Sequence, residues 1–121
     1  MKILILEDDN NRINIFIKKL KEHDLDITDN SSIAIEYLTN NNYDYLFLDH
    51  DLGGLQNEWN EEDCGMCVVD YLCNLPDSSK LLNMYCVVHS FNTYRAEIMN
   101  SRLQKAGYKS QYCPGAWEKL E

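Results

Sequence analysis

The chain has 121 residues, of which 45% are apolar, so it has the size and apolar content of one folded domain, and wholesale disorder is excluded. Its formal net charge of −9 makes duplex nucleic acid a poor partner, because such binding depends on a basic face. It contains no run of about 18 apolar residues and begins with a strand-like segment, which argues against a membrane span or a signal peptide.

Short apolar runs and segments of helical periodicity alternate along the sequence. The apolar runs predict strands, and apolar residues three and four positions apart predict helices. In chain order we expect a strand at 2–6, a helix at 13–20, a strand at 25–28, a helix from the Asn30 cap to the polar stop at 40–42, a strand at 46–49, a helix at 65–75, a strand at 84–88, a helix at 96–106 and a strand at 109–113. No linker or repeat interrupts this pattern, so we expect residues 1–121 to form a single domain.

This alternation predicts an α/β fold. Five strands that alternate with helices form a parallel sheet with right-handed crossovers and helices on both faces. Ligands of such sheets bind outside the carboxyl ends of the strands. The residues that follow each strand are therefore the main guide to function.

The third strand ends in a group of polar residues, within the stretch 42–54 (NYDYLFLDHDLGG). Asp49 and Asp51 share one side if the strand continues, and His50 points to the other side. The two aspartates could instead cap or form a turn before the glycines that follow. On this stretch alone, the two interpretations are evenly matched.

Two other strands also end in polar residues. The first ends at Asp8 and Asp9, and the fourth ends at His89 and Ser90. Capping alone does not account well for three such strand ends. We therefore expect these groups to converge in one crevice.

Five cysteines raise the question of a metal or redox site. Cys64 and Cys67 have the CxxC spacing, but a structural zinc site needs four ligands and no second such pair follows. A thioredoxin-type pair would follow an early strand and open a helix, whereas this pair follows an acidic loop. We therefore expect free thiols. The odd number of cysteines favours a reducing, cytoplasmic compartment.

The acidic run after the first strand, the aspartate that ends the third and the hydroxyl residue that ends the fourth resemble the receiver domains of two-component signalling. The resemblance covers nearly the whole chain and implies a flavodoxin-like fold, with a five-stranded parallel sheet of order 2-1-3-4-5. It implies that Asp8 and Asp9 bind a metal ion and that Asp49 accepts a phosphoryl group. It also implies that Ser90 touches the phosphoryl oxygen.

The chain departs from receivers at one position. A receiver has a lysine immediately before the proline that follows the fifth strand, and this position is Cys113 here. Lys109 lies four residues upstream and does not simply replace it. The departure counts against a phospho-acceptor and suggests a narrower relative.

Two motifs resemble the receiver-like family called cyclic-phosphate processing receiver domains. They are LDHDLGG at 48–54 and HSFN at 89–92, with the run GMCVVDYL at 65–72 between them. The family is found among phage and bacterial proteins and has been linked to cyclic nucleotide signals. The resemblance implies that a small phosphate-containing ligand, a cyclic phosphate or cyclic nucleotide, is processed in the crevice.

Clustered aspartates would repel one another unless a divalent cation compensated their charge. Oxygen ligands suit Mg²⁺ or Mn²⁺, and a nearby histidine also makes Fe or Zn²⁺ compatible. A bound cation polarises a phosphoryl oxygen and lowers the pKa of its water. The predicted metal ligands are Asp8, Asp9, Asp49 and Asp51.

The predicted catalytic residues are Asp49, Asp51 and His89. His89 could protonate the leaving alkoxide, since the pKa of a histidine is about 6.5, or it could be a strand-end histidine bonded to backbone. The predicted contacts of the phosphate are His50, Ser90, Asn92, Arg95 and Arg12, with the backbone N–H groups that open the fourth helix. For each arginine, a surface charge or an ion pair is an equally good interpretation.

Three functions remain compatible with the sequence. The first is a metal-dependent phosphoesterase that opens a cyclic phosphate, which the histidine and additional aspartate favour. The second is a receiver switch that is phosphorylated on Asp49, which the missing lysine disfavours. The third is a binding module that sequesters a nucleotide without cleaving it. Only His89, an acid that mere binding does not need, separates the first from the third.

Overall fold

The computed structural model describes residues 1–50 and 64–116, so the predicted site residue Asp51 lies outside the described part of the chain. The described elements are β1 Lys2–Leu6, α1 Asn10–Lys19, β2 Asp24–Thr28, α2 Ser31–Asn40, β3 Tyr45–Leu48, α3 Gly65–Asn74, β4 Tyr85–Val88, α4 Thr93–Lys105 and β5 Lys109–Tyr112. A short 3-10 turn, Asp77–Ser79, follows α3. Every predicted strand and helix is present, with ends displaced by less than one helical turn.

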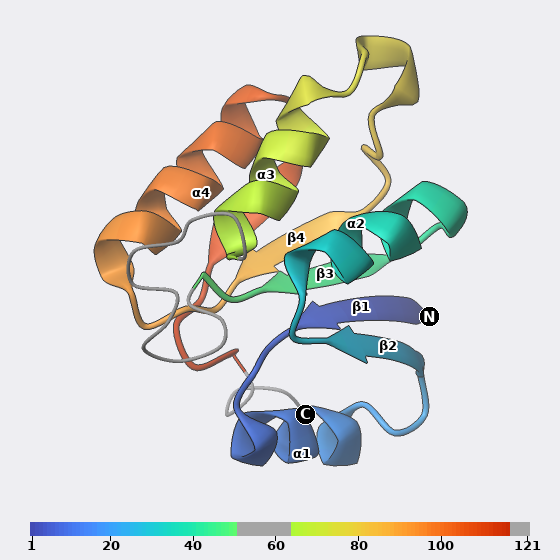
Figure 1. Ribbon diagram of the computed structural model, residues 1–121, viewed down its shortest axis with the longest axis vertical. Coiled ribbons are helices and arrows are strands. Elements are labelled where there is room, and N and C mark those ends of the chain that lie inside the picture. Colours follow the sequence, from blue (N-terminus) through green and yellow to red (C-terminus); the bar gives the residue numbers. More distant parts are fainter. Residues whose placement is uncertain (51–63, 117–121) are drawn as a thin grey trace.

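The five strands form one parallel sheet of order β2-β1-β3-β4-β5. This is the flavodoxin-like receiver topology that the sequence predicts. Helices α2, α3 and α4 lie on one side of the sheet and α1 lies on the other (Figure 1). No helix in the described part of the chain has the length and apolar character needed to cross a bilayer.

The alternation of side chains along the strands divides the core in two. Leu4, Leu46 and Cys86 belong to the larger cluster, which α2, α3 and α4 cover. Ile3, Ile5, Phe47 and Val87 face the other way, where α1 covers them with Phe16 and Leu20. These strands are buried on both faces, which is why they are continuous apolar runs in the sequence.

Polar side chains fix where three of the helices begin. Asp9, Asn30 and Asn92 each accept a hydrogen bond from a backbone N–H in the first turn of α1, α2 and α4 respectively. Asparagine and aspartate are favoured at this position because they satisfy an otherwise unpaired donor. After α4, Gly107 has φ of 101°, the left-handed conformation that glycine commonly adopts after a helix C-terminus.

Candidate metal centre and phosphate site

Three polar side chains stand in a row across the carboxyl ends of neighbouring strands. The last residues of β1, β3 and β4 are paired in register, and Glu7, Asp49 and His89 each come next in the chain. The ladder continues through them, since the backbone N–H of Asp49 donates to Leu6 (3.1 Å) and that of His89 donates to Leu48 (2.9 Å). All three side chains therefore lie on the α1 face of the sheet.

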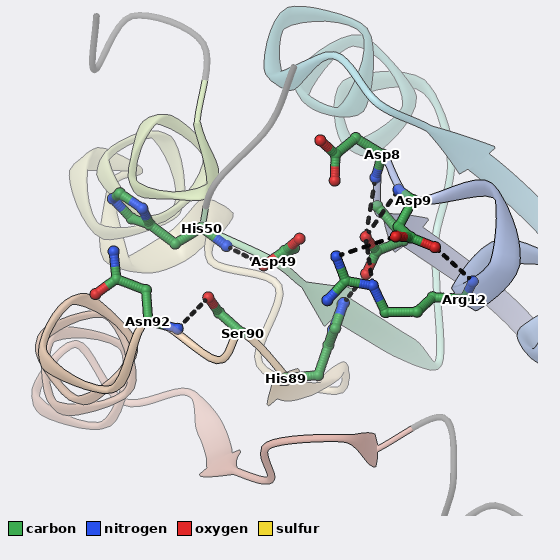
Figure 2. Close-up of polar contacts among 9 residues, drawn as sticks. Asp8, Asp9, Arg12, Asp49, His50, His89, Ser90 and Asn92 are labelled. Atoms are coloured by element: carbon green, nitrogen blue, oxygen red, sulfur yellow. Dashed lines mark hydrogen bonds and ion pairs between the residues drawn. The ribbon is translucent and has the colours of Figure 1, made fainter. Parts of the chain in front are cut away.

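The row is buried, and Figure 2 shows the side chains of Asp49 and His89 at the ends of their strands. The exposed fractions of Glu7, Asp49 and His89 are 0%, 3% and 0%. The Nε2 atom of His89 lies 2.8 Å from Oε2 of Glu7. The centre of the His89 ring lies 5.4 Å from the centre of the Phe16 ring and 6.4 Å from the centre of the Phe47 ring. Aromatic packing and one hydrogen bond thus fix the position of His89.

Glu7 is held by several donors. Its Oε1 atom accepts the backbone N–H groups of Asp8 and Asp9, each at 3.1 Å. The Nε atom of Arg12, one turn into α1, lies 3.5 Å from the same oxygen. These contacts allow a carboxyl group to be completely buried at this position.

Burial changes the protonation of the row. It raises the pKa of Asp49 to about 7, and the neighbouring Glu7 adds to the rise. His89, Arg12 and a hydrogen bond from Ser90 oppose it. Burial also raises the pKa of Glu7, and it lowers the pKa of His89 to about 4. At neutral pH the imidazole is therefore neutral, and Asp49 is close to its titration midpoint.

A divalent cation fits this donor set. Glu7, Asp49 and His89 each offer a ligand atom, and these atoms all lie within 4.8 Å of one another. Two ligands of one small divalent ion stand about 3 Å apart, so a cation would take the place of the proton that lies between Glu7 and His89 at 2.8 Å. Two carboxylates with one neutral imidazole suit Mn²⁺ or Zn²⁺ better than they suit Mg²⁺.

The predicted metal ligands after β1 have different surroundings. The carboxylate of Asp9 caps α1 by accepting the N–H of Arg12 (3.0 Å), and it pairs with the Arg12 guanidinium at 3.8 Å. Asp8 is half-buried, and its carboxylate points away from the side chains of Asp9 and Arg12 (Figure 2). Asp9 therefore has a structural role in this arrangement, and Asp8 lies outside the group of described residues whose ligand atoms are within 4.8 Å of one another.

The predicted phosphate contacts after β4 lie beside Asp49. Ser90 is 1% exposed, and its hydroxyl accepts the N–H of Asn92 at 3.1 Å. Asn92 caps α4 by accepting the N–H of Arg95 at 3.3 Å. The positive end of the α4 dipole therefore lies next to the row, where it favours an anion.

The other residues predicted to contact the phosphate are His50, Arg95 and Arg12, and each has different surroundings. His50 is 7% exposed, and its N–H donates to the Asp49 carboxylate at 2.9 Å, while its ring points away from that carboxylate (Figure 2). Arg95 is half-buried, with its guanidinium carbon 6.0 Å from the centre of the Tyr94 ring. Arg12 is already paired with Glu7 and Asp9, so it supports the row as part of its charge balance.

Glu7 is the site residue that the sequence prediction missed. The run 7–9 suggests a pair of metal ligands, and the prediction chose Asp8 and Asp9 from it. Strand alternation would have found Glu7, because Ile5 and Glu7 have the same spacing as Phe47 and Asp49 in β3. The signal was thus the two-residue spacing from Ile5 to Glu7, and using it requires knowing that the ends of β1 and β3 are paired in register.

Solved structures with the same fold include several receiver proteins. A sensor protein from Polaromonas sp. JS666 is 20% identical, with a TM-score of 0.66 over 93% of this chain and 82% of that one. The Mn²⁺-bound response regulator Rcp1 is 18% identical, with a TM-score of 0.65 over 93% and 79%. The response regulator TrrA from Thermotoga maritima, in complex with Mg²⁺-BeF, is 18% identical, with a TM-score of 0.64 over 93% and 84%. At these identities the likeness shows the fold.

A comparison with curated proteins finds no match. The model of one family matches residues 2–105, which is most of the chain and contains all three residues of the buried row. That family is described as the cyclic-phosphate processing receiver domain, the family that the LDHDLGG and HSFN motifs resemble. The chain therefore belongs to the cyclic-phosphate processing receiver domain family.

Proposed function

We propose that this domain is a metal-dependent phosphoesterase that opens a cyclic phosphate, with a cyclic nucleotide as the substrate class. The observation that carries the proposal is the buried row of Glu7, Asp49 and His89 beside the N-terminus of α4. The row offers a cation site, and the helix end offers an anion site. A phosphodiester whose phosphorus must be activated needs both.

The residues at the start of α4 hold the phosphate in this proposal. Ser90 and the N-terminal end of α4 orient the phosphate against the row, and Arg95 supplies positive charge from one turn into the helix. The row, together with Asp8 from outside it, would hold a divalent cation, which would supply polarisation of a phosphoryl oxygen. Water would add to phosphorus, the ring P–O bond would break, and the proton that the water loses would go to the alkoxide oxygen that leaves.

Asp49 would be a ligand of the cation in this scheme. Its pKa of about 7 belongs to the metal-free protein, and a bound cation would hold the carboxylate in its ionised form. His89 is neutral at this pH and bonded to Glu7, which favours a role as ligand and support. The proton donation that the sequence suggests for His89 stays a prediction.

A receiver switch phosphorylated on Asp49 is the second candidate. Asp49 directly follows β3 in a receiver fold and lies within reach of Ser90, as a phospho-acceptor would. The position of the receiver lysine counts against it, because Cys113 packs against the apolar cluster of the α1 face. The basic side chains that lower the pKa of Asp49 are His89 and Arg12, and neither stands at the lysine position.

The test is incubation of the protein with cyclic mono-, di- and oligonucleotides in the presence of Mn²⁺ or Mg²⁺, followed by chromatography. We expect one class to be opened to a linear phosphate, Asp49→Asn to lose the activity, and the exposed Asp77→Asn variant to keep it. Stoichiometric labelling of Asp49 by acetyl phosphate without cleavage would establish the switch instead. Release of an intact nucleotide from heated protein, again without cleavage, would establish sequestration.

A further inference from the structure

The helix α3 begins with two cysteines in a single turn. Cys64 is the residue before the first turn, and Cys67 is the third residue of the helix. The N–H of Cys67 donates to the carbonyl of Cys64 at 3.1 Å, which closes the turn between them. The sequence argument against a redox pair was that this pair follows an acidic loop, but the structure shows that it also opens a helix.

The two sulfur atoms are neighbours. Cys67 lies close enough to the Cys64 thiol to help raise its pKa, and both cysteines are reduced in the structure. Residues three apart in a helical turn have Cβ atoms about 5 Å apart, so a small adjustment brings them to disulfide distance. Two thiols of a CxxC turn at a helix start have the arrangement found in dithiols that form reversible disulfides.

The two thiols differ in access. Cys64 is 2% exposed, whereas Cys67 is half-buried. Burial raises the pKa of the Cys64 thiol to about 11. A small oxidant therefore reaches Cys67 first, and Cys64 is held next to it, protected from direct attack.

We propose that Cys64 and Cys67 form a redox-active dithiol that a low-molecular-weight disulfide such as oxidised glutathione closes to an intramolecular disulfide. The Cys67 thiolate attacks the glutathione disulfide, forms a mixed disulfide and releases one glutathione thiol. The Cys64 thiolate then attacks the Cys67 sulfur, forms the intramolecular bond and releases the second glutathione thiol. The protein loses two electrons and two protons, which the two released glutathione molecules carry.

A zinc site is the competing interpretation of such a pair. Zinc needs further ligands, and within residues 1–50 and 64–116 the group of His, Cys, Asp and Glu side chains close enough to share an ion is Glu7, Asp49 and His89, which contains neither cysteine. Exchange with a disulfide needs only two sulfur atoms. The two cysteines are therefore sufficient for a redox role, whereas a zinc site would need further ligands.

The dithiol adjoins the buried row. Gly65, between the two cysteines, donates its N–H to the carbonyl of His50 at 3.0 Å and lies directly against the carbonyl oxygen of Asp49. Cys64 is therefore bonded in the chain to the residue that contacts the backbone of Asp49. The proposal itself does not depend on the function proposed for that row.

The experiment counts thiols before and after oxidation. Wild-type protein is treated with oxidised glutathione, quenched with acid and alkylated with N-ethylmaleimide in denaturant. The reduced chain has five cysteines and takes five adducts, and we expect the oxidised chain to take three, with a mass lower by about 2 Da before alkylation. Proteolysis and mass spectrometry should place the bond between Cys64 and Cys67.

Three variants sharpen the result. Cys64→Ser should trap one glutathione on Cys67, because the second thiol is missing, and Cys67→Ser should form no intramolecular disulfide. Cys73→Ser removes the other thiol of α3 and should oxidise like wild type. Five adducts after oxidation, or a bond that joins Cys73, Cys86 or Cys113, would overturn the proposal. The peptide map of wild type gives this answer even if a variant fails to fold.

Discussion

The Nε2 atom of His89 lies 2.8 Å from Oε2 of Glu7, although the two residues are 82 positions apart in the chain. The strand between their two strands is β3, so the pair spans the position that Asp49 occupies. Both groups are completely buried. The pair therefore holds the ends of three strands together and determines the charge that surrounds Asp49.

His89→Gln should make the protein less sensitive to acid than wild type. Burial lowers the pKa of His89 to about 4, so the imidazole stays neutral in the fold while it becomes protonated in the unfolded chain below about pH 6.5. His89 therefore contributes stability above pH 6.5 that is lost as the pH falls toward 4. Between pH 7 and pH 5, the variant should gain on the order of 2 kcal/mol relative to wild type.

Urea denaturation at several pH values measures this difference. His23→Gln is the matched control for the loss of a histidine outside the row. Parallel pH profiles for wild type and His89→Gln would show that the imidazole is not buried in its neutral form.

Mn²⁺ should raise the melting temperature by on the order of 10 °C at about 100 times its dissociation constant, because it binds the native state only. Glu7→Gln should lose most of this shift. Asp9→Asn should keep it, since asparagine caps a helix as well as aspartate does. If both variants lose the Mn²⁺-induced shift equally, the metal ligands include Asp9, and the site is not the row of Glu7, Asp49 and His89.

The same shift should depend on pH. A proton and a cation compete for Asp49, whose pKa is about 7, so the Mn²⁺-induced shift should be larger at pH 8 than at pH 6. Asp49→Asn should remove both the shift and its pH dependence. Thermal scans at fixed Mn²⁺ concentration measure both. A shift that does not change with pH would exclude Asp49 from the ligands.

Gly65→Ala should destabilise the fold by about 3 kcal/mol or more. A Cβ there would overlap the carbonyl oxygen of Asp49, and backbone cannot move aside as a flexible side chain can. Gly107→Ala is the matched control, with a nearest contact of 3.7 Å and only the strain of φ at 101°, so about 1 kcal/mol is expected. Denaturant unfolding gives both values, and equal costs would show that the approach of α3 to β3 is looser than described.

Cys113→Lys distinguishes the two candidate functions. A lysine there restores the residue that receivers use, so a switch should be labelled more efficiently by acetyl phosphate. A phosphoesterase that relies on the buried row should open its cyclic phosphate no faster. Labelling and cleavage are measured on the same preparation. A gain in cleavage would mean that a positive side chain at position 113 helps the phosphoesterase, which contradicts this prediction.

The fold could be predicted because each of its features has a local signal. Strands buried on both faces are apolar runs, and the helices between them carry apolar residues at helical spacing. The Asn30 cap and the left-handed Gly107 are likewise properties of single residues in their own neighbourhood. Strand order followed from the family resemblance, and the parallel register confirms it.

The site was only partly predictable, because it is made by contacts between distant strands. Asp49, His89 and Ser90 stood out as polar residues at the ends of apolar runs. The choice between Glu7 and its two neighbours depends on which side chain points to the α1 face, and the burial of His89 depends on Phe16 from another element. Neither property is present in a segment taken alone.

Helix α1 is attached to the sheet chiefly through Phe16 and Leu20, whereas α2, α3 and α4 share a larger core and pack on one another. In native-state hydrogen exchange, the amides of α1 should therefore open at a lower free energy than those of α3 and α4. Each opening removes Arg12 from Glu7 and uncovers His89. Local unfolding of a single helix would thus admit water to the buried row while the rest of the sheet stays folded.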